Sequence, residues 1–339
     1  MPILGIIASG ISGNLGPPPA IAVAHNSSPF LSVYPWSPGF GTKYADPASL
    51  PTGNGRSVSF RPQGDTIALA SEGSPYISAY PWSLGFGTKY ANPATLPAGA
   101  GTGVDFSSSG NDIALANGGS PTTTAYPWSS GFGTKYADPA SLPTGDPQGI
   151  VFRPQADTVV IAGNTTPFIF AYPWSAGFGT KYANPATLPA NQGRSVDFTP
   201  NGNDLAIAHN EGAYVTAYPW SSGFGTKYSN PGIGAGGNGY GVAFAPQGDT
   251  IALAHTNNPY ITAWPWSSGF GTKYSNPGGL TANGKSVAFS RLGDSIALGH
   301  IDQGTGRNIS AWPWAAGFGT KYAQPASEPP ARVRGVTFL

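Results

Sequence analysis

Four histidines stand at matching places in the sequence, each at the end of a short apolar run. In Ile251-Ala252-Leu253-Ala254, the run before His255, bulky residues alternate with alanine, which is typical of a strand. The equal placement predicts that the imidazoles reach one rim of a closed structure. Other runs end in Ser71, Asn117 and Gly163, so simple polar strand ends facing water remain the alternative. The four histidines are His25, His209, His255 and His300.

A second set of polar residues precedes a repeated Val-x-Phe pattern by two positions. If these residues lie on the same rim as the histidines, guanidinium, ammonium, phenol and imidazole groups would surround a central channel. Such a rim could bind an anion or a sugar acid. The alternative is again a solvated rim without a ligand. The members of this set are Arg56, Arg194, Tyr240, Lys285 and Arg334.

No motif unites these residues into a catalytic or metal-binding constellation. A metal site needs convergent ligands with supporting partners, and the histidines fall in separate repeats. Asp65 and Asn111 occupy the same turn position, and a catalytic carboxylate would not tolerate that exchange. The sequence has no nucleophile elbow, phosphate loop or calcium loop. We therefore predict no catalytic residue, no metal and no cofactor.

Composition excludes several classes of partner. Charged residues make up 9% of the chain and the net charge is +1, so no strong field attracts nucleic acid. There is no cysteine, and hence no disulfide framework. No apolar run has the roughly 18 residues of a membrane span, so we expect no membrane insertion. The N-terminus lacks the basic region of a secretory signal peptide.

The elements that position the polar residues are set by an internal repeat. A stretch such as Tyr80-Pro81-Trp82-Ser83-Leu84-Gly85-Phe86-Gly87-Thr88-Lys89-Tyr90 occurs seven times, at successive spacings of 46, 46, 46, 46, 46 and 48 residues. This period predicts the blades of a β-propeller. The repeated tryptophans are predicted to pack between blades, with sugar-stacking pockets as the alternative. They are Trp36, Trp82, Trp128, Trp174, Trp220, Trp266 and Trp314.

Each repeat offers four short runs, so we predict an all-β, seven-bladed propeller of four-stranded blades. The fourth strand would be Gly87–Ala91 and its copies, with a lysine that protects the edge. The C-terminal strand should join the N-terminal blade and close the ring. The predicted parts are an arm at 1–19 and a propeller at 20–339, with blades at 20–47 plus 333–339, 54–93, 100–139, 146–185, 192–231, 238–277 and 283–325.

The order of runs resembles the WD40 family. Ala263-Trp264-Pro265 stands where that family has its Trp-Asp ending, although the Asp and the family's Gly-His are missing. The arm, from Pro2 to Gly13, resembles the N-terminus of tailed-bacteriophage structural proteins, and the YPWSxGFGTKY repeats resemble proteins from phage genomes. These resemblances imply a tail-associated virion protein.

From this resemblance we expect a non-enzymatic structural protein of a phage particle, located in the virion. The arm would dock into other virion proteins through apolar side chains, and the rim would contact a protein or the host surface. A carbohydrate-binding propeller lectin or adhesin is the first alternative. A propeller lactonase or another hydrolase is the second. The docking residues are Ile3, Leu4, Ile6 and Ile7.

Overall fold

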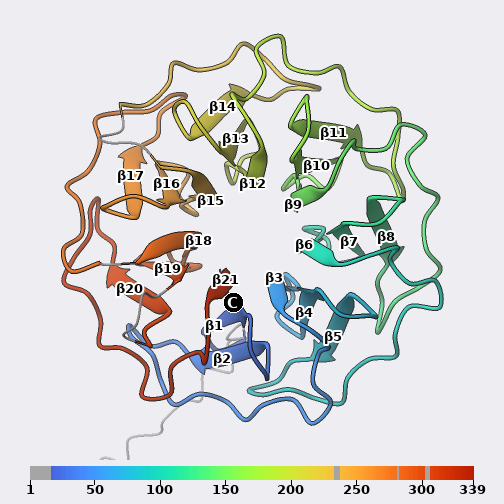
Figure 1. Ribbon diagram of the computed structural model, residues 1–339, viewed down its shortest axis with the longest axis horizontal. Helices are drawn as coiled ribbons and strands as arrows, with labels where there is room; N and C mark the ends of the chain where they lie inside the picture. The colour runs from blue at the N-terminus through green and yellow to red at the C-terminus, as the bar shows by residue number, and fades with distance from the viewer. Residues whose placement is uncertain (1–16, 233–236, 281, 302–305) are drawn as a thin grey trace, which may run out of the picture.

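The computed structural model describes residues 17–232, 237–280, 282–301 and 306–339. Seven antiparallel sheets stand as blades around a central channel, so the predicted all-β, seven-bladed propeller is confirmed (Figure 1). Among the described residues, no helix is long and apolar enough to cross a membrane.

Each blade has an inner, a middle and an outer strand. The inner strands are β3 (Gly55–Phe60), β6 (Gly101–Phe106), β9 (Pro147–Phe152), β12 (Gly193–Phe198), β15 (Gly239–Phe244), β18 (Asn283–Phe289) and β21 (Val333–Phe338). The middle strands are β4 (Thr66–Ser71), β7 (Asp112–Asn117), β10 (Thr158–Gly163), β13 (Asp204–His209), β16 (Thr250–His255), β19 (Ser295–Ile301) and β1 (Ala20–His25). The outer strands are β5 (Ile77–Pro81), β8 (Thr123–Pro127), β11 (Ile169–Pro173), β14 (Val215–Pro219), β17 (Ile261–Pro265), β20 (Ile309–Pro313) and β2 (Leu31–Pro35).

The middle strands are buried on both faces, which explains their alternation of bulky residues with alanine. In β7, the side chains of Ile113 and Leu115 pack in one cluster with Ala68 and Ala70 of the preceding blade. The small face of one blade thus receives the large face of its neighbour, as close packing requires.

The predicted fourth strand is wrong: each blade has three strands. The segment Gly87–Ala91 follows the outside of the ring and pairs with β5 only sparsely (Figure 1). Its backbone donates from Gly87 to Pro81 at 2.8 Å and from Tyr90 to Ala79 at 3.0 Å. Pro81 has no N–H, so the strand edge cannot continue a regular ladder here.

The C-terminal strand closes the ring as predicted. β21 pairs antiparallel with β1, with Ile21 opposite Phe338 and Val23 opposite Val336. The Leu339 N–H then donates to the Ala20 carbonyl at 2.9 Å. The first and last described parts of the chain therefore share one blade.

The repeated tryptophans fill the gaps between blades. Trp82 is buried and meets Tyr44 and Phe86 edge-to-face at ring-centroid distances of 5.1 and 5.2 Å. The other six tryptophans are buried too, between 2% and 7% exposed. The alternative of one sugar-stacking pocket per blade is thus wrong for these rings, because none of the seven side chains is more than 7% exposed.

Blades are also linked in pairs through the turns after the inner strands. The Arg61 guanidinium donates to the Gly110 carbonyl at 2.8 Å, and Arg153 makes the same bond to Gly202 at 2.9 Å. The two contacts are 153 − 61 = 92 residues apart, which is twice the repeat. The glutamines of these turns make parallel contacts to the next blade, namely Gln63 to Ser109, Gln155 to Asn201 and Gln247 to Leu292.

Most of the predicted arm lies outside the described residues. Its docking residues Ile3, Leu4, Ile6 and Ile7 belong to that part, and their proposed role stays a prediction. Of the arm, 17–19 are described, and these three prolines line an apolar hollow together with Trp36 and Leu339 of the closing blade.

Candidate functional site: the basic mouth of the channel

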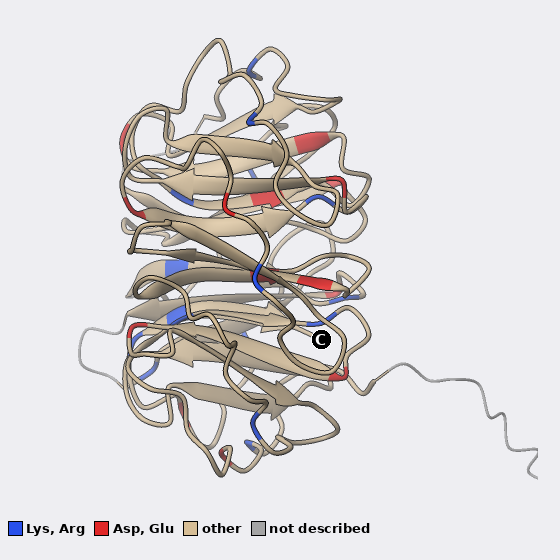
Figure 2. Cartoon of the chain, turned by 90° about the vertical axis from the view of Figure 1, so that its right-hand side faces the viewer, with Lys and Arg blue, Asp and Glu red and all other residues tan. Residues whose placement is uncertain are grey.

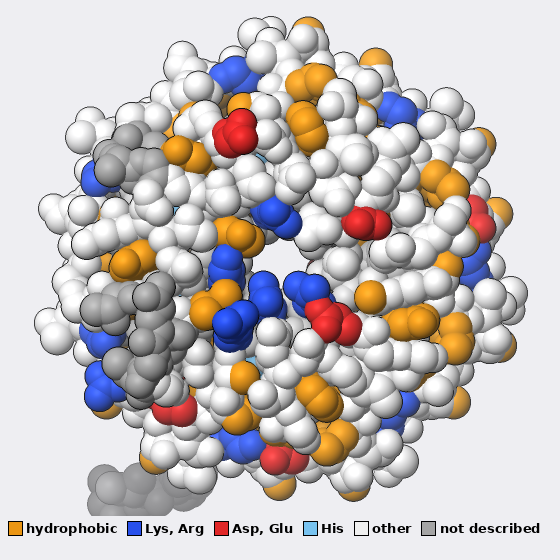
Figure 3. All heavy atoms as spheres, viewed as in Figure 1, with side chains coloured by type: hydrophobic (Ala, Val, Ile, Leu, Met, Phe, Trp, Pro, Cys, Tyr) orange, Lys and Arg blue, Asp and Glu red, His pale blue; other side chains and the backbone are white. Residues whose placement is uncertain are grey.

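Every blade sends one side chain to the same mouth of the central channel, and each is the second or third residue of an inner strand. We call this set the mouth ring. Figure 3 shows its basic members gathered around the opening, and Figure 2 shows basic residues of the strands toward one face of the ring. The mouth ring consists of Arg56, Thr102, Gln148, Arg194, Tyr240, Lys285 and Arg334.

A β-bulge positions each member of the mouth ring. In the first complete blade Gly55 pairs with Ser71 and Ser57 pairs with Ala70, so Arg56 is the extra residue. An extra residue is left out of the ladder, and its side chain can be aimed elsewhere. The same register shift occurs in all seven blades. Glycine is needed at Gly55, since a Cβ there would lie 2.4 Å from the Phe30 carbonyl oxygen.

The mouth ring is strongly basic. It holds three arginines and one lysine, and the carboxylate of Glu72 forms an ion pair with Arg56. Arg194 is held by Gln148 at 3.3 Å and by Gln192 at 2.9 Å, both through side-chain oxygens. These acceptors are neutral, so they orient the guanidinium without cancelling its charge. The cavity below the mouth has a volume of about 340 Å³.

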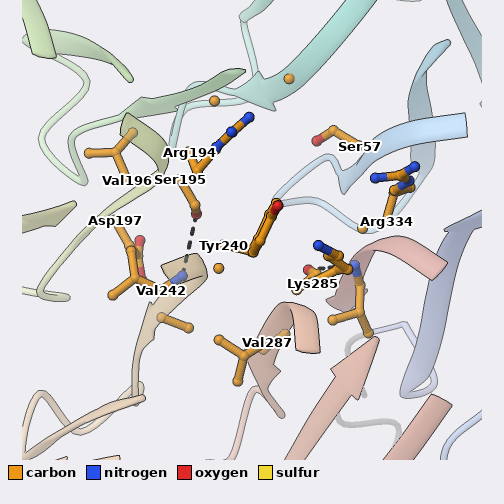
Figure 4. Close-up of a pocket in the computed structure, with 18 of the residues that line it drawn as sticks. Ser57, Arg194, Ser195, Val196, Asp197, Tyr240, Val242, Lys285, Val287 and Arg334 are labelled. Carbon is orange, nitrogen blue, oxygen red and sulfur yellow. Dashed lines mark hydrogen bonds between the residues drawn. The ribbon is translucent and has the colours of Figure 1, made fainter. Parts of the chain in front are cut away.

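Lys285 and Tyr240 form the most unusual contact of the mouth ring. The Lys285 Nζ lies 3.1 Å from the centroid of the Tyr240 ring, and the Arg194 Cζ lies 5.3 Å from the same centroid. Figure 4 shows Arg194, Tyr240, Lys285 and Arg334 around one pocket. Burial, followed by repulsion from Arg334, Arg194 and Arg332, lowers the pKa of Lys285 to about 7. A large part of this amine is therefore neutral near pH 7.

Two carboxylates lie on the inner strands beyond the ring, and one of them, Asp197, lines the cavity. Asp197 accepts hydrogen bonds from the backbone N–H of Phe198 at 2.9 Å and of Phe244, in the next blade, at 2.8 Å. Asp105 accepts from the Ser59 hydroxyl at 3.2 Å and from the Phe152 N–H at 2.9 Å. Burial raises the pKa of each carboxyl to about 7, although these bonds oppose the shift. Both groups join the inner strands of adjacent blades.

The two carboxylates predict different responses to an Asp→Asn change. Asp105→Asn can turn its amide toward the Ser59 hydroxyl and keep the Phe152 bond. Asp197→Asn must set its amide nitrogen against a backbone N–H. We expect Asp197→Asn to lower the free energy of unfolding by about 1–3 kcal/mol and Asp105→Asn to cost clearly less. Urea unfolding of the two variants at pH 7 measures the difference, and equal losses would refute this account.

The same carboxyls predict a pH dependence of stability. Their folded-state pKa of about 7 lies above the ordinary 3.8, so the folded state holds these protons more tightly than the unfolded state. Their contribution to stability is therefore fully present below pH 4, falls as pH rises from 4 to 7, and is constant above. Melting curves recorded from pH 4 to 8 should show that the melting temperature falls less steeply with pH for Asp105→Asn than for the unsubstituted protein.

The predicted histidines do not reach the mouth ring, and this part of the rim prediction is wrong. They end middle strands that are buried on both faces, so the imidazoles lie inside the blades. His209 Nε2 bonds the Thr216 hydroxyl at 2.8 Å, and His255 Nε2 bonds Thr262 at 2.9 Å. His25 and His300 make the matching bonds to Ser32 and Ser310 at 3.0 and 3.1 Å. Burial lowers the pKa of His25 and His255 to about 4, so both are neutral.

The five predicted basic and phenolic residues do come together. Arg56, Arg194, Tyr240, Lys285 and Arg334 are all members of the mouth ring, although their role in binding stays a prediction.

Sequence reasoning missed four further channel residues. Thr102 and Gln148 hold the matching bulge positions, and the repeat alignment alone could have found them. Asp105 and Asp197 are acidic at the middle position of Val-x-Phe, a signal that was present but not used. Within the described residues, no three His, Asp or Glu side chains converge into a metal site.

Comparison with known proteins supports the fold. No protein-family model matches the sequence, and no curated protein matches it either. Similar solved structures include a functionally unknown protein from Desulfotomaculum acetoxidans (12% identity, TM-score 0.70, covering 94% of this chain and 98% of that one). A second is a putative 6-phosphogluconolactonase from Bacteroides uniformis (14% identity, TM-score 0.67, covering 95% of this chain and 99% of that one). A third is the periplasmic gluconolactonase of Pseudomonas aeruginosa (12% identity, TM-score 0.70, covering 95% of this chain and 99% of that one).

These similarities correct the predicted function. The resemblance to WD40 proteins is supported as far as a seven-bladed, propeller-like fold. The bacteriophage assignment is wrong, because two of the similar structures are named as lactonases and none of those compared is named as a tail protein. The same finding contradicts the prediction of a non-enzymatic virion protein for host attachment, and it directs attention to the chemistry of the mouth ring.

Proposed function

We propose that this chain is a hydrolase that opens small anionic sugar lactones at the mouth ring. The observation that carries the proposal is the mouth ring itself, in which four of seven blades contribute a basic side chain to one opening. Two structures of similar fold are named as a gluconolactonase and a putative 6-phosphogluconolactonase, which supports this class of substrate. The cavity of about 340 Å³ suits a ligand of that size.

Arginine suits the anionic group of such a substrate. A guanidinium presents a planar fork of N–H donors that matches a phosphate or carboxylate. Arg194 and Arg334 are the best placed, because their hydrogen-bond partners Gln148, Gln192 and Asn26 are neutral amides. Arg56 contributes less, since Glu72 already neutralises it.

Lys285 is the candidate general base. Its neutral amine would take a proton from water while the water oxygen attacks the lactone carbonyl carbon. The guanidinium of Arg194 or Arg334 would stabilise the resulting oxyanion. The ring C–O bond then breaks, the proton passes to the departing ring oxygen, and the product is an open hydroxy acid. Tyr240 holds the amine over its ring at the edge of the cavity.

The test is to follow acid release from 6-phosphoglucono-δ-lactone and from uncharged glucono-δ-lactone, each corrected for spontaneous hydrolysis. We expect faster hydrolysis of the phosphorylated lactone. Arg194→Gln should raise its KM by roughly tenfold or more, because a charged hydrogen bond contributes about 1.5–3 kcal/mol. Lys227→Gln, on the outer wall, is the matched control and should behave like the unsubstituted protein. Rates no higher than the spontaneous ones, or an Arg194→Gln variant whose KM for the phosphorylated lactone equals that of Lys227→Gln, would refute the proposal.

A further inference from the structure

Lys285 differs from the seven other lysines in its surroundings. Each of those seven lies in a copy of the Gly-Thr-Lys-Tyr stretch on the outer wall. Six of them donate to an aspartate or asparagine three residues later, as Lys135 does to Asp138. Lys285 instead stands on an aromatic ring among arginines, at the mouth of a cavity. Within the described residues, no carboxylate forms an ion pair with it.

Most of the groups around this amine favour its neutral form. Arg194, Arg332 and Arg334 repel a positive charge on Lys285. The Tyr240 ring attracts it, and Glu72 is already engaged with Arg56. Burial adds to the repulsion, and together they bring the pKa of Lys285 to about 7. A neutral lysine in a desolvated, cationic site is a nucleophile, because its nitrogen lone pair is free.

From this geometry we propose that Lys285 is a nucleophilic lysine that forms a Schiff base with small aldehydes or ketones carrying a phosphate or carboxylate. The anion-binding part of the proposed function underlies this inference, whereas lactone hydrolysis does not. Arg194 and Arg334 would hold the anionic group, which brings the carbonyl carbon to the amine. Open-chain sugar phosphates and keto acids belong to this chemical class.

The step needs no oxidant or reductant. The Lys285 nitrogen lone pair forms a C–N bond to the carbonyl carbon, and the carbonyl oxygen takes up a proton. The nitrogen loses one proton to give a carbinolamine. The hydroxyl of the carbinolamine then leaves as water with the second proton of the nitrogen, and an imine remains. The reverse reaction with water releases the carbonyl compound unchanged, so the site would be a reversible covalent trap for such ligands.

Pyridoxal phosphate is a suitable probe, because it joins an aldehyde to a phosphate. The intact protein would be incubated with it at pH 7, reduced with borohydride, digested and analysed by peptide mass spectrometry. At pH 7 a pKa of about 7 against the ordinary 10.5 makes the neutral fraction about 10³-fold larger. We expect Lys285 to be labelled at least about tenfold faster than any outer-wall lysine. Burial also lowers the pKa of Lys89, so that residue is the most stringent internal comparison.

Three controls separate the parts of the proposal. Inorganic phosphate should protect Lys285, and pyridoxal without phosphate should label it more slowly. Lys285→Arg should remove the fast label, while Lys135→Arg should leave it in place. Arg334→Gln removes a repelling charge, so the pH midpoint of labelling should move upward.

Equal labelling of Lys285 and the outer-wall lysines would overturn the inference, as would labelling that phosphate does not slow. The labelling needs no turnover, so it is independent of the lactone assay. Labelling of Lys285 in a protein without lactonase activity would support the covalent site and refute the hydrolytic function. Lactone hydrolysis without selective labelling of Lys285 would support the hydrolytic function and refute the covalent site.

Discussion

Deleting residues 333–339 is expected to turn the closed ring into a protein that aggregates and no longer unfolds cooperatively. The deletion removes β21, the inner strand of the closing blade, and leaves the inner edge of β1 without its partner. Unpaired edges of this length pair readily with other chains. Size-exclusion chromatography and thermal melts of the truncated chain measure the effect.

The size of the loss follows from what β21 buries. Val333 is fully buried, Val336 and Leu339 are nearly so, and Phe338 meets Trp36 edge-to-face at 5.1 Å. At about 1.5–3 kcal/mol for each fully buried large apolar side chain, Val333, Val336 and Leu339 contribute roughly 5–9 kcal/mol, and the partly buried Phe338 adds less. That is comparable with the whole stability of a typical domain, about 5–15 kcal/mol.

A circular permutant provides the control. In the complete blades, four residues such as Pro62–Asp65 follow the position of Arg61 and lead into the middle strand. Placing 333–339 before Ala20, with a Pro-Gln-Gly-Asp link, would supply the same strand from the other end of the chain. This permutant should be soluble and melt in one transition. A truncated chain that is soluble and melts in one transition without this strand would show that β21 is not needed to close the ring.

Replacing Lys285 with glutamine is expected to lower kcat for lactone hydrolysis by about 10²–10⁴-fold, the usual contribution of a general base. KM should change less, because the guanidinium groups of Arg194 and Arg334 remain. In the unsubstituted protein the rate should rise with pH through about 7, as Lys285 loses its proton. Arg334→Gln should shift this midpoint upward, since one repelling charge is lost.

Two variants make this result specific. Lys285→Arg keeps the charge but cannot act as a base near neutral pH, so it should be as impaired as the glutamine variant. Lys135→Gln, on the outer wall, should leave kcat and its pH profile unchanged. A Lys285→Gln protein that keeps its kcat, or one whose pH midpoint near 7 persists, would exclude Lys285 as the base.

The fold could be predicted because the repeat leaves few alternatives. Alternation of Ile and Leu with Ala specifies a middle strand buried on both faces, and Val58 at two positions before Phe60 specifies an inner strand. The prediction of a fourth strand was wrong because a sequence with Gly87 and Pro81 fits an extended segment without regular pairing as well as a hydrogen-bonded strand. Extended backbone does not become a strand without a partner that can donate along its length.

The site was only partly predictable, because a propeller places residues by their strand position and not by their chemistry. Arg194 and Lys285 were found by their offset from the Val-x-Phe pattern. The prediction that the histidines reach the rim was wrong because the end of a strand need not lie at the surface. His209 ends its strand but lies inside its blade. The bulge that aims Arg194 at the channel depends on pairing with a strand that follows in the chain, and no local pattern reports it.

The glutamine contacts between paired blades set one blade of the ring apart from the other six. The glutamine contacts join the first complete blade to the second, the third to the fourth and the fifth to the sixth. These three pairs account for six of the seven blades. The blade left over is the one assembled from both ends of the chain, β1 and β2 with β21. The closing blade therefore lies outside the two-blade pattern of glutamine contacts that the other six blades follow.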